Sequence, residues 1–255
     1  QITDKGIGNG ISLLIFAGIV SRIPASVYQL YALTKVGTIN LLMLVIFAIL
    51  GVVVIVGVIA VQEAERRVPV QYAKRIVGRK VYGGQSTHIP IKVNAAGVIP
   101  VIFAMSILLF PSTLAGFFPN SKVMTSIAEF LKPSGWLYAV LYALFIVFFT
   151  YFYTAITFNP VEVADNMKKY GGFIPGMRPG RPTAEYISRI MNRITLVGAL
   201  FLAAIALMPY FMTALSGINI SFGGTALLIV VGVALETMKA IEAQMLMRHY
   251  QGFLK

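Results

Sequence analysis

Few side chains in this sequence could take part in covalent or metal chemistry. The chain has no cysteine and only two histidines, His88 and His249. Neither histidine has a cysteine or a group of carboxylates at the spacing that a metal site requires. Ser12 and Ser106 fall within apolar segments, where no base is placed to activate a hydroxyl as a nucleophile. The sequence therefore predicts no catalytic residue, no metal site and no cofactor, and we do not expect an enzyme.

Basic residues form the second chemical feature, because they are numerous and clustered. The chain carries 21 Lys and Arg against 9 Asp and Glu, a net charge of +12. Two stretches, residues 62–94 and 159–193, hold most of these cations. In a soluble protein such a surplus would suggest nucleic acid as the partner. The residues singled out for docking a partner are Arg66, Arg67, Lys74, Arg75, Arg79 and Lys80 in the first stretch and Arg178 in the second.

The composition places these basic stretches in a membrane protein. Of the 255 residues 58% are hydrophobic and only 12% are charged, whereas about a quarter of a soluble domain is charged. No charged residue lies within residues 36–62, 133–161 or 194–235. Each window exceeds the roughly 20 apolar residues that cross the hydrocarbon core of a bilayer.

Six apolar segments are candidate spans, and we predict an all-α fold: a polytopic membrane helix bundle of about six transmembrane helices with two long cytoplasmic loops. The first segment, about residues 7–33, is the weakest, because Arg22 and Pro24 follow an apolar run that ends at Val20. A helix on the membrane surface is the alternative there. The sixth segment is apolar only to Leu235 and then continues as an amphipathic helix. The other four are residues 41–61, 95–118, 136–158 and 194–212.

The charge distribution predicts how these segments are organised. Excess Lys and Arg mark cytoplasmic loops, so both basic loops and both termini are expected in the cytoplasm. The predicted regions are transmembrane helices at 1–61, a basic loop at 62–94, transmembrane helices at 95–158, a basic loop at 159–193, transmembrane helices at 194–235 and a cytoplasmic tail at 236–255.

Both loops show signs of internal structure. Val68, Val70 and Tyr72 alternate with polar residues or proline, which predicts extended, hairpin-like structure with a turn at Gly83-Gly84. The second loop is expected to open as a helix, to break at Gly171-Gly172 and to turn again over residues 176–180. We expect two platforms that project from the membrane.

Isoleucines are the notable residues of the spans. Ile11 and Ile15 share a helix face after a glycine-rich start, Ile102 shares a face with Val98 that Pro100 interrupts, and Ile229 follows a glycine pair. Such residues can pack against lipid or other helices, or they can close a pore by excluding water. Their spacing does not distinguish between these two roles. The spans carry no acidic or basic residue at membrane depth, which argues against a secondary transporter. A membrane-embedded scaffold without a pore, in which the isoleucines only pack, is the other alternative interpretation.

A series of motifs decides among these alternatives. In chain order they are residues 1–12 (QITDKGIGNGIS), 72–75 (YAKR), 85–94 (QSTHIPIKVN), 96–100 (AGVIP), 158–160 (FNP), 164–166 (ADN), 175–180 (PGMRPG) and 222–225 (FGGT). In order and spacing they resemble the SecY family, the central channel subunit of the bacterial Sec protein translocase, from its fifth span to its tenth. The family's first four spans are absent from the sequence, which is therefore expected to belong to a longer chain.

The resemblance implies a function and partners. It implies a channel in the bacterial plasma membrane that passes unfolded secretory polypeptides across and releases signal sequences into lipid. Ile11, Ile15, Ile102 and Ile229 would belong to the pore constriction, and the spans at 95–118 and 136–158 would form one wall of the lateral gate. The basic loops would dock the ribosome through its rRNA phosphates and the SecA motor, with Arg178 as the first residue to test. SecE, SecG, translocating polypeptides and anionic lipids are the other implied partners.

Overall fold

A computed structural model of the chain describes residues 3, 6, 10–35, 37, 41–72, 75–77, 80–82, 86–118, 121–123, 126, 129, 131–132, 135–216 and 224–252. The chain divides into two compact units. The first comprises Gln1–Ala60 and Ile205–Lys255, and the second is Val61–Ala204. Each unit is described by itself.

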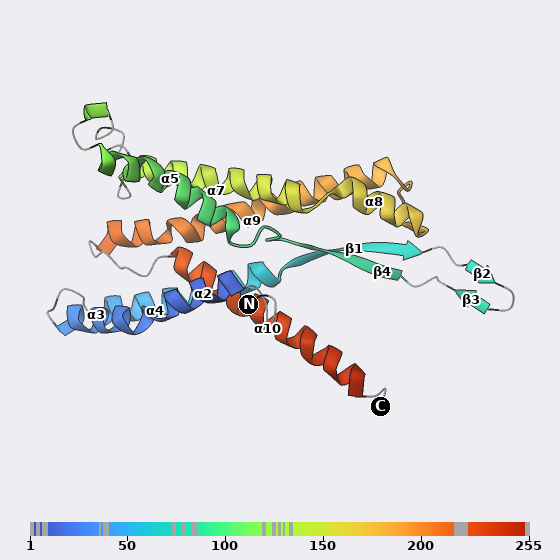
Figure 1. Cartoon of the computed structure of the whole chain (residues 1–255), viewed down its shortest axis with the longest axis horizontal. Coiled ribbons are helices and arrows are strands. Elements are labelled where there is room, and N and C mark those ends of the chain that lie inside the picture. The colour runs from blue at the N-terminus through green and yellow to red at the C-terminus, as the bar shows by residue number, and fades with distance from the viewer. Residues whose placement is uncertain are drawn as a thin grey trace. The chain divides into compact units, whose positions relative to one another are not determined.

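The first unit consists of helices (Figure 1). Its helices are α2 (Gly10–Val20), α3 (Ile23–Lys35), α4 (Leu41–Glu63), the end of α9 (Arg181–Ser216) and α10 (Gly224–Gly252). The first predicted span is two helices joined by a turn at Ser21-Arg22, where the Arg22 N–H donates to the Ile19 carbonyl at 3.1 Å. Pro24 lies in the first turn of α3, where its missing N–H costs nothing.

The second unit combines helices with a small sheet (Figure 1). Its helices are α5 (Ile99–Phe117), α7 (Trp136–Thr157), α8 (Pro160–Lys169) and the beginning of α9, and its strands are β1 (Glu65–Tyr72), β2 (Arg75–Val77), β3 (Lys80–Tyr82), β4 (Ser86–Lys92) and β5 (Gly172–Phe173). The prediction of a mainly helical membrane protein is confirmed, and the strands lie within the two predicted loops.

Five helical stretches of the described residues are long and apolar enough to cross a membrane: Ser12–Lys35, Leu42–Glu63, Ile99–Phe117, Trp136–Lys169 and Arg181–Thr213. The sixth candidate is not among them. Its helix, α10, carries Glu236, Lys239 and Glu242 after Leu235, as the predicted amphipathic continuation requires. The loop predicted at 159–193 is shorter in the structure, because α9 already begins at Arg181.

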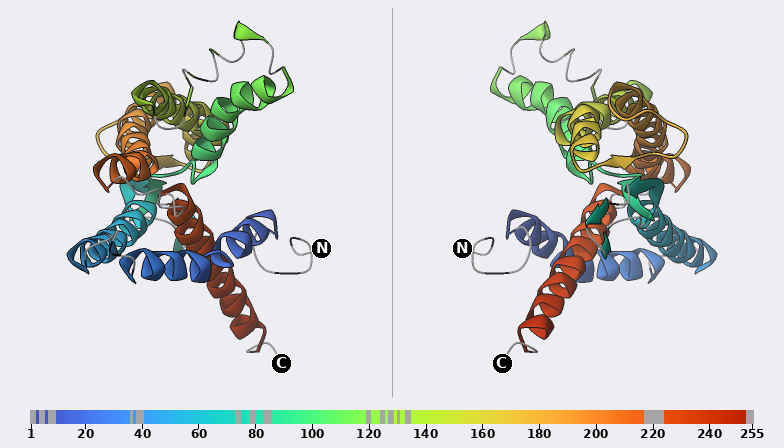
Figure 2. Two further views of the ribbon diagram at one scale, coloured as in Figure 1. Left: turned by 90° about the vertical axis from the view of Figure 1, so that its left-hand side faces the viewer. Right: turned by 90° about the vertical axis from the view of Figure 1, so that its right-hand side faces the viewer.

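Helices α5 and α7 lie side by side (Figures 1 and 2). The buried residues of α5 include Val101, Ala104 and Leu108, at the spacing of one helix face. The buried residues of α7 recur every four positions: Tyr138, Tyr142, Ile146, Thr150 and Thr154. The two helices therefore hold each other by an interface of regularly spaced side chains.

Pro100 does not interrupt α5, contrary to the prediction. The proline lies in the first turn of the helix, after Val98 as the N-cap residue. Its fixed φ suits that turn, so it marks the start of the helix. Ile102 therefore follows on regular helix, and its N–H donates to the Val98 carbonyl at 3.3 Å.

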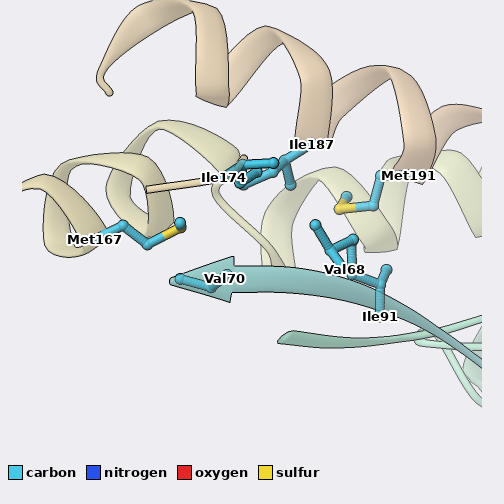
Figure 3. Packing of buried hydrophobic residues seen from close by; sticks show 7 residues of the cluster. All are labelled: Val68, Val70, Ile91, Met167, Ile174, Ile187 and Met191. Carbon is cyan, nitrogen blue, oxygen red and sulfur yellow. The ribbon is translucent and has the colours of Figure 1, made fainter. Parts of the chain in front are cut away.

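Strands β1 and β4 form an antiparallel ribbon, which confirms the extended structure predicted for the first loop. The register runs from Glu65 opposite Lys92 to Gln71 opposite Ser86. Strands β2 and β3 pair as a second hairpin, and the predicted turn at Gly83-Gly84 lies outside the described residues. The buried side chains of Val68 and Val70 face a hydrophobic cluster (Figure 3). The other buried members of the cluster are Ile91, Met167, Ile174, Ile187 and Met191.

The sequence predicts two platforms, one for each loop, but in the structure the two loops form a single one. Strand β5, from the second loop, pairs with β1 through Gln71–Phe173 and Tyr72–Gly172. A Cβ on Gly172 would lie 3.0 Å from the Tyr72 ring, so the close approach of β5 to β1 favours glycine. We call strands β1, β4 and β5, helix α8 and residues 174–180 the platform.

The platform is fixed to α9 by a close contact at Gly198. The Val93 N–H donates to the Ala64 carbonyl at 2.9 Å, which holds the end of the ribbon. A Cβ at position 198 would lie 2.6 Å from the Val93 carbonyl oxygen, a distance that no side chain tolerates. Only glycine lets the backbone of the ribbon and α9 come this close.

We therefore predict that Gly198→Val destabilises the protein by about 1–3 kcal/mol, because the ribbon must move off α9. The measurement is the thermal unfolding midpoint of the purified protein in detergent, with wild type alongside. Gly51→Val in α4 is the matched control, since a Cβ there meets nothing within 4 Å. An unchanged midpoint in Gly198→Val would contradict the contact.

Candidate functional site

The exposed cations of β1 belong to the platform. Val68 and Val70 are buried, whereas Arg66, Arg67 and Pro69 are exposed. The Arg67 Nε lies 2.8 Å from Glu65 Oε1, but the Arg67 side chain remains 72% exposed. An ion pair this exposed contributes little to stability, so both guanidinium groups stay available to a partner.

Two further predicted docking residues lie in the hairpin formed by β2 and β3. Arg75 pairs with Tyr82, and Lys80 pairs with Val77. Lys74 and Arg79, also predicted as docking residues, lie outside the described residues. The structure therefore confirms an extended backbone at Arg75 and Lys80 and leaves the role of all four cations a prediction.

Arg178 lies in a loop whose backbone is fixed. Gly176 and Gly180 flank it with positive φ of 82° and 104°, a conformation that glycine adopts at little cost. The buried Thr183 donates its hydroxyl to the Arg178 carbonyl at 2.9 Å, and the Met177 N–H donates to the Ile174 carbonyl at 3.0 Å. The Arg178 side chain is exposed and forms no ion pair with any described residue. The loop thus holds a free guanidinium group on an ordered backbone.

Helix α8 leads the chain from α7 to this loop. Asn159 caps it by accepting hydrogen bonds from the N–H groups of Val161 at 3.1 Å and Glu162 at 3.5 Å, and Pro160 occupies the first turn. Asn followed by Pro is a helix-start signal, so the sequence alone could have identified this cap. Met167 of α8 and Ile174 then enter the hydrophobic cluster, which anchors the Arg178 loop to the cations of β1 (Figure 3).

The predicted pore residues belong to both units. Ile15 of α2 is 40% exposed, Ile229 of α10 is half-buried, and these two helices contact each other in the first unit. The Ile11 side chain lies outside the described residues. Ile102 of α5, in the second unit, is 38% exposed, because the buried face of α5 is formed by Val101 and its neighbours. Their role in a constriction stays a prediction.

The described residues offer little for catalysis or metal binding. No group of three or more His, Asp or Glu among them comes close enough to hold a metal ion. Among these residues, the polar groups that could bind a partner are exposed arginines, and the exposed apolar groups lie on the surfaces of long helices.

Solved structures share this fold. One is of a protein conducting channel, with a TM-score of 0.60 over 95% of this chain and 60% of that one. Another comes from work on the plug domain of the SecY protein, with a TM-score of 0.59 over 95% of this chain and 61% of that one. Both are 20% identical to this chain, so they inform on the fold alone.

Curated relatives are much closer in sequence. Protein translocase subunit SecY of Thermotoga maritima is 49% identical over 255 residues, that of Halalkalibacterium halodurans 51% over 267 and that of Escherichia coli 48% over 258. Each alignment covers 100% of this chain, which spans 57%, 61% and 58% of those relatives. The profile of the SecY family matches residues 1–238. The chain therefore belongs to the SecY family.

Proposed function

We propose that this chain forms the C-terminal portion of a protein-conducting channel in the bacterial plasma membrane. The channel passes unfolded secretory polypeptides across the membrane and releases signal sequences and membrane segments into it. The observation that carries the proposal is the match of the SecY family over residues 1–238. The apolar helices and the exposed basic platform are what such a channel requires.

The proposed constriction consists of apolar side chains. An unfolded polypeptide must pass while ions are blocked, and flexible isoleucines achieve this by excluding water when no polypeptide is present. Ile11, Ile15, Ile102 and Ile229 are the proposed members from this chain. The exposure of Ile15 and Ile102 supports this, because neither side chain is consumed by packing within its own unit. A transporter would instead need ionisable groups near the membrane midplane.

The paired helices α5 and α7 are the proposed wall of a lateral gate. Their shared buried face lets them move as one body, while the opposite face of α5 stays available to a signal sequence. The rings of Phe103 and Phe149, 5.8 Å apart and stacked, add to the contact between the two helices. Lateral release is then a displacement of this pair.

The platform is the proposed docking surface on the cytoplasmic side, where both ends of this chain also lie. Exposed arginines neutralise rRNA phosphates of a ribosome and attract acidic surfaces of the SecA motor. Arg178 is the foremost candidate, since its backbone is already ordered and binding costs little conformational entropy. The remaining docking residues are Arg66, Arg67, Lys74, Arg75, Arg79 and Lys80. SecE and SecG are the proposed companion subunits, and anionic lipids are proposed to contact the basic loops.

The first prediction concerns the pore. A single cysteine introduced by Ile102→Cys will crosslink to a translocating polypeptide that is arrested in the assembled complex, because Ile102 contacts the passing chain. The 255 residues contain no cysteine, so this part of the complex adds no background reaction, and any cysteine elsewhere in the complex is replaced by Ser. Ile107→Cys is the control: Ile107 is 43% exposed against 38% for Ile102, and it lies about 140° around the same helix. Equal crosslinking at both positions, or none at Ile102→Cys, would sink the assignment.

The second prediction concerns docking. Arg178→Glu will slow partner-driven translocation into vesicles about tenfold, which corresponds to about 1.4 kcal/mol of lost partner affinity. The protein will insert and unfold like wild type, because the Arg178 side chain makes no ion pair with any described residue. Lys168→Glu on α8 introduces the same charge change at another exposed position and will have a smaller effect. If the two variants slow translocation equally, general charge attraction replaces the specific role of Arg178.

A further inference from the structure

A groove opens between α7 and α9 in the second unit. It has a volume of about 330 Å³ and includes Phe148, Tyr151 and Phe152 of α7 together with Asn192 and Thr195 of α9. We propose that the groove binds one anionic phospholipid, with an acyl chain against the two phenylalanines and the phosphate at Arg189 and Arg193. The proposal rests on the membrane-spanning character of α7 and α9 and not on the translocation activity.

One hydrogen bond joins the two helices at the groove. The Tyr151 hydroxyl donates to the Asn192 carbonyl at 2.9 Å and thereby ties α7 to α9. The two helices also lie next to each other in the end-on views (Figure 2). Phe148 and Phe152 are 56% and 54% exposed. About half of the surface of each ring is therefore left uncovered by the described residues.

Two arginines border the groove on α9. Arg189, Asn192 and Arg193 are spaced i, i+3 and i+4, so they are neighbours on one helix face. Asn192 lines the groove, and both arginines are exposed and form no ion pair with any described residue. Glu185, one turn before Arg189, is paired with Arg181 at 3.4 Å. By this spacing, two guanidinium groups that no described residue pairs with border the groove on the Asn192 face of α9, and a phosphate accepts paired hydrogen bonds from such groups.

The location favours a lipid over a protein segment. The groove lies near the ends of α7 and α9 that lead to the platform, where the apolar stretch of each helix gives way to charge. Tyrosine at such a position is typical of the boundary between hydrocarbon and headgroups. Helix partners in a membrane approach closely through small residues. The lining does include Thr154, Ala155 and Thr195, but Phe148 and Phe152 are more than half exposed and keep a partner backbone away from them. An anionic phospholipid matches both the apolar lining and the positive border.

The test places a tryptophan reporter in the groove of the protein in its assembled complex. Trp136, the only tryptophan of the 255 residues, is replaced by Phe, as is any tryptophan in the rest of the complex, and Phe152→Trp is introduced. The complex is reconstituted in phosphatidylcholine vesicles that contain a minor fraction of brominated phosphatidylglycerol or, separately, brominated phosphatidylcholine. Bromine on the acyl chain quenches a tryptophan that it contacts. Phe110→Trp on α5, where Phe110 is 63% exposed, reports on ordinary lipid, and Phe148→Trp provides a second groove reporter.

At the groove reporters, we expect brominated phosphatidylglycerol to quench more strongly than brominated phosphatidylcholine. The ratio of the two should exceed the ratio at Phe110→Trp about fivefold for each arginine that binds the phosphate. The double variant Arg189→Gln with Arg193→Gln will abolish that difference. Lys168→Gln with Lys169→Gln, which removes the same charge from α8, will preserve it. The proposal is overturned by equal preference at all reporters, by preference that survives the arginine variant, or by equal loss in both double variants. Protection of the groove reporters from both lipids would show that a protein segment fills the groove and would also overturn it.

Discussion

The hydrocarbon of a bilayer offers no hydrogen-bond partners, and the rest of this structure depends on that constraint. Every backbone N–H and C=O within the membrane must be satisfied inside the chain, so the long apolar segments are helices. Among the described residues, sheet structure occurs only within the two basic loops, where water can satisfy the free edges of β2, β3, β4 and β5. The division between helical spans and a partly β-structured platform follows directly from the solvent on each side of the boundary.

The same constraint explains which features the sequence reveals. Charge-free windows predict the spans because a charge inside lipid is costly, and among the described residues each window contains helix: α4, α7, and α9 with α10. The alternation of Val68 and Val70 predicts a strand because one face is buried. The pairing of β5 with β1 could not be predicted, since it depends on two residues of a distant loop and on the small size of Gly172. The sequence alone predicts a break at Pro100, because a proline in the first turn of a helix and one inside a helix look alike when the helix start is unknown.

In the candidate site, too, some features can be predicted from the sequence and others are visible only in the structure. Arg178 stands out in the sequence among glycines and prolines, but the hydrogen bond from Thr183 that orders its backbone is visible only in the structure. The isoleucines of the proposed constriction depend on helices from both units, so no local pattern distinguishes them from packing residues. The groove between α7 and α9 was invisible for a related reason: its two arginines are ordinary loop cations until Tyr151 is seen to meet Asn192.

The contact between Gly198 and the Val93 carbonyl has a consequence for how this gene can vary. Every single-base change that alters the amino acid encoded by a glycine codon introduces a residue with a Cβ atom or a stop. At position 198 each such residue meets the carbonyl oxygen 2.6 Å away. No conservative replacement therefore exists at this site, and any drift there requires a compensating shift of the ribbon. We therefore expect position 198 to remain glycine for as long as the ribbon keeps its place against α9.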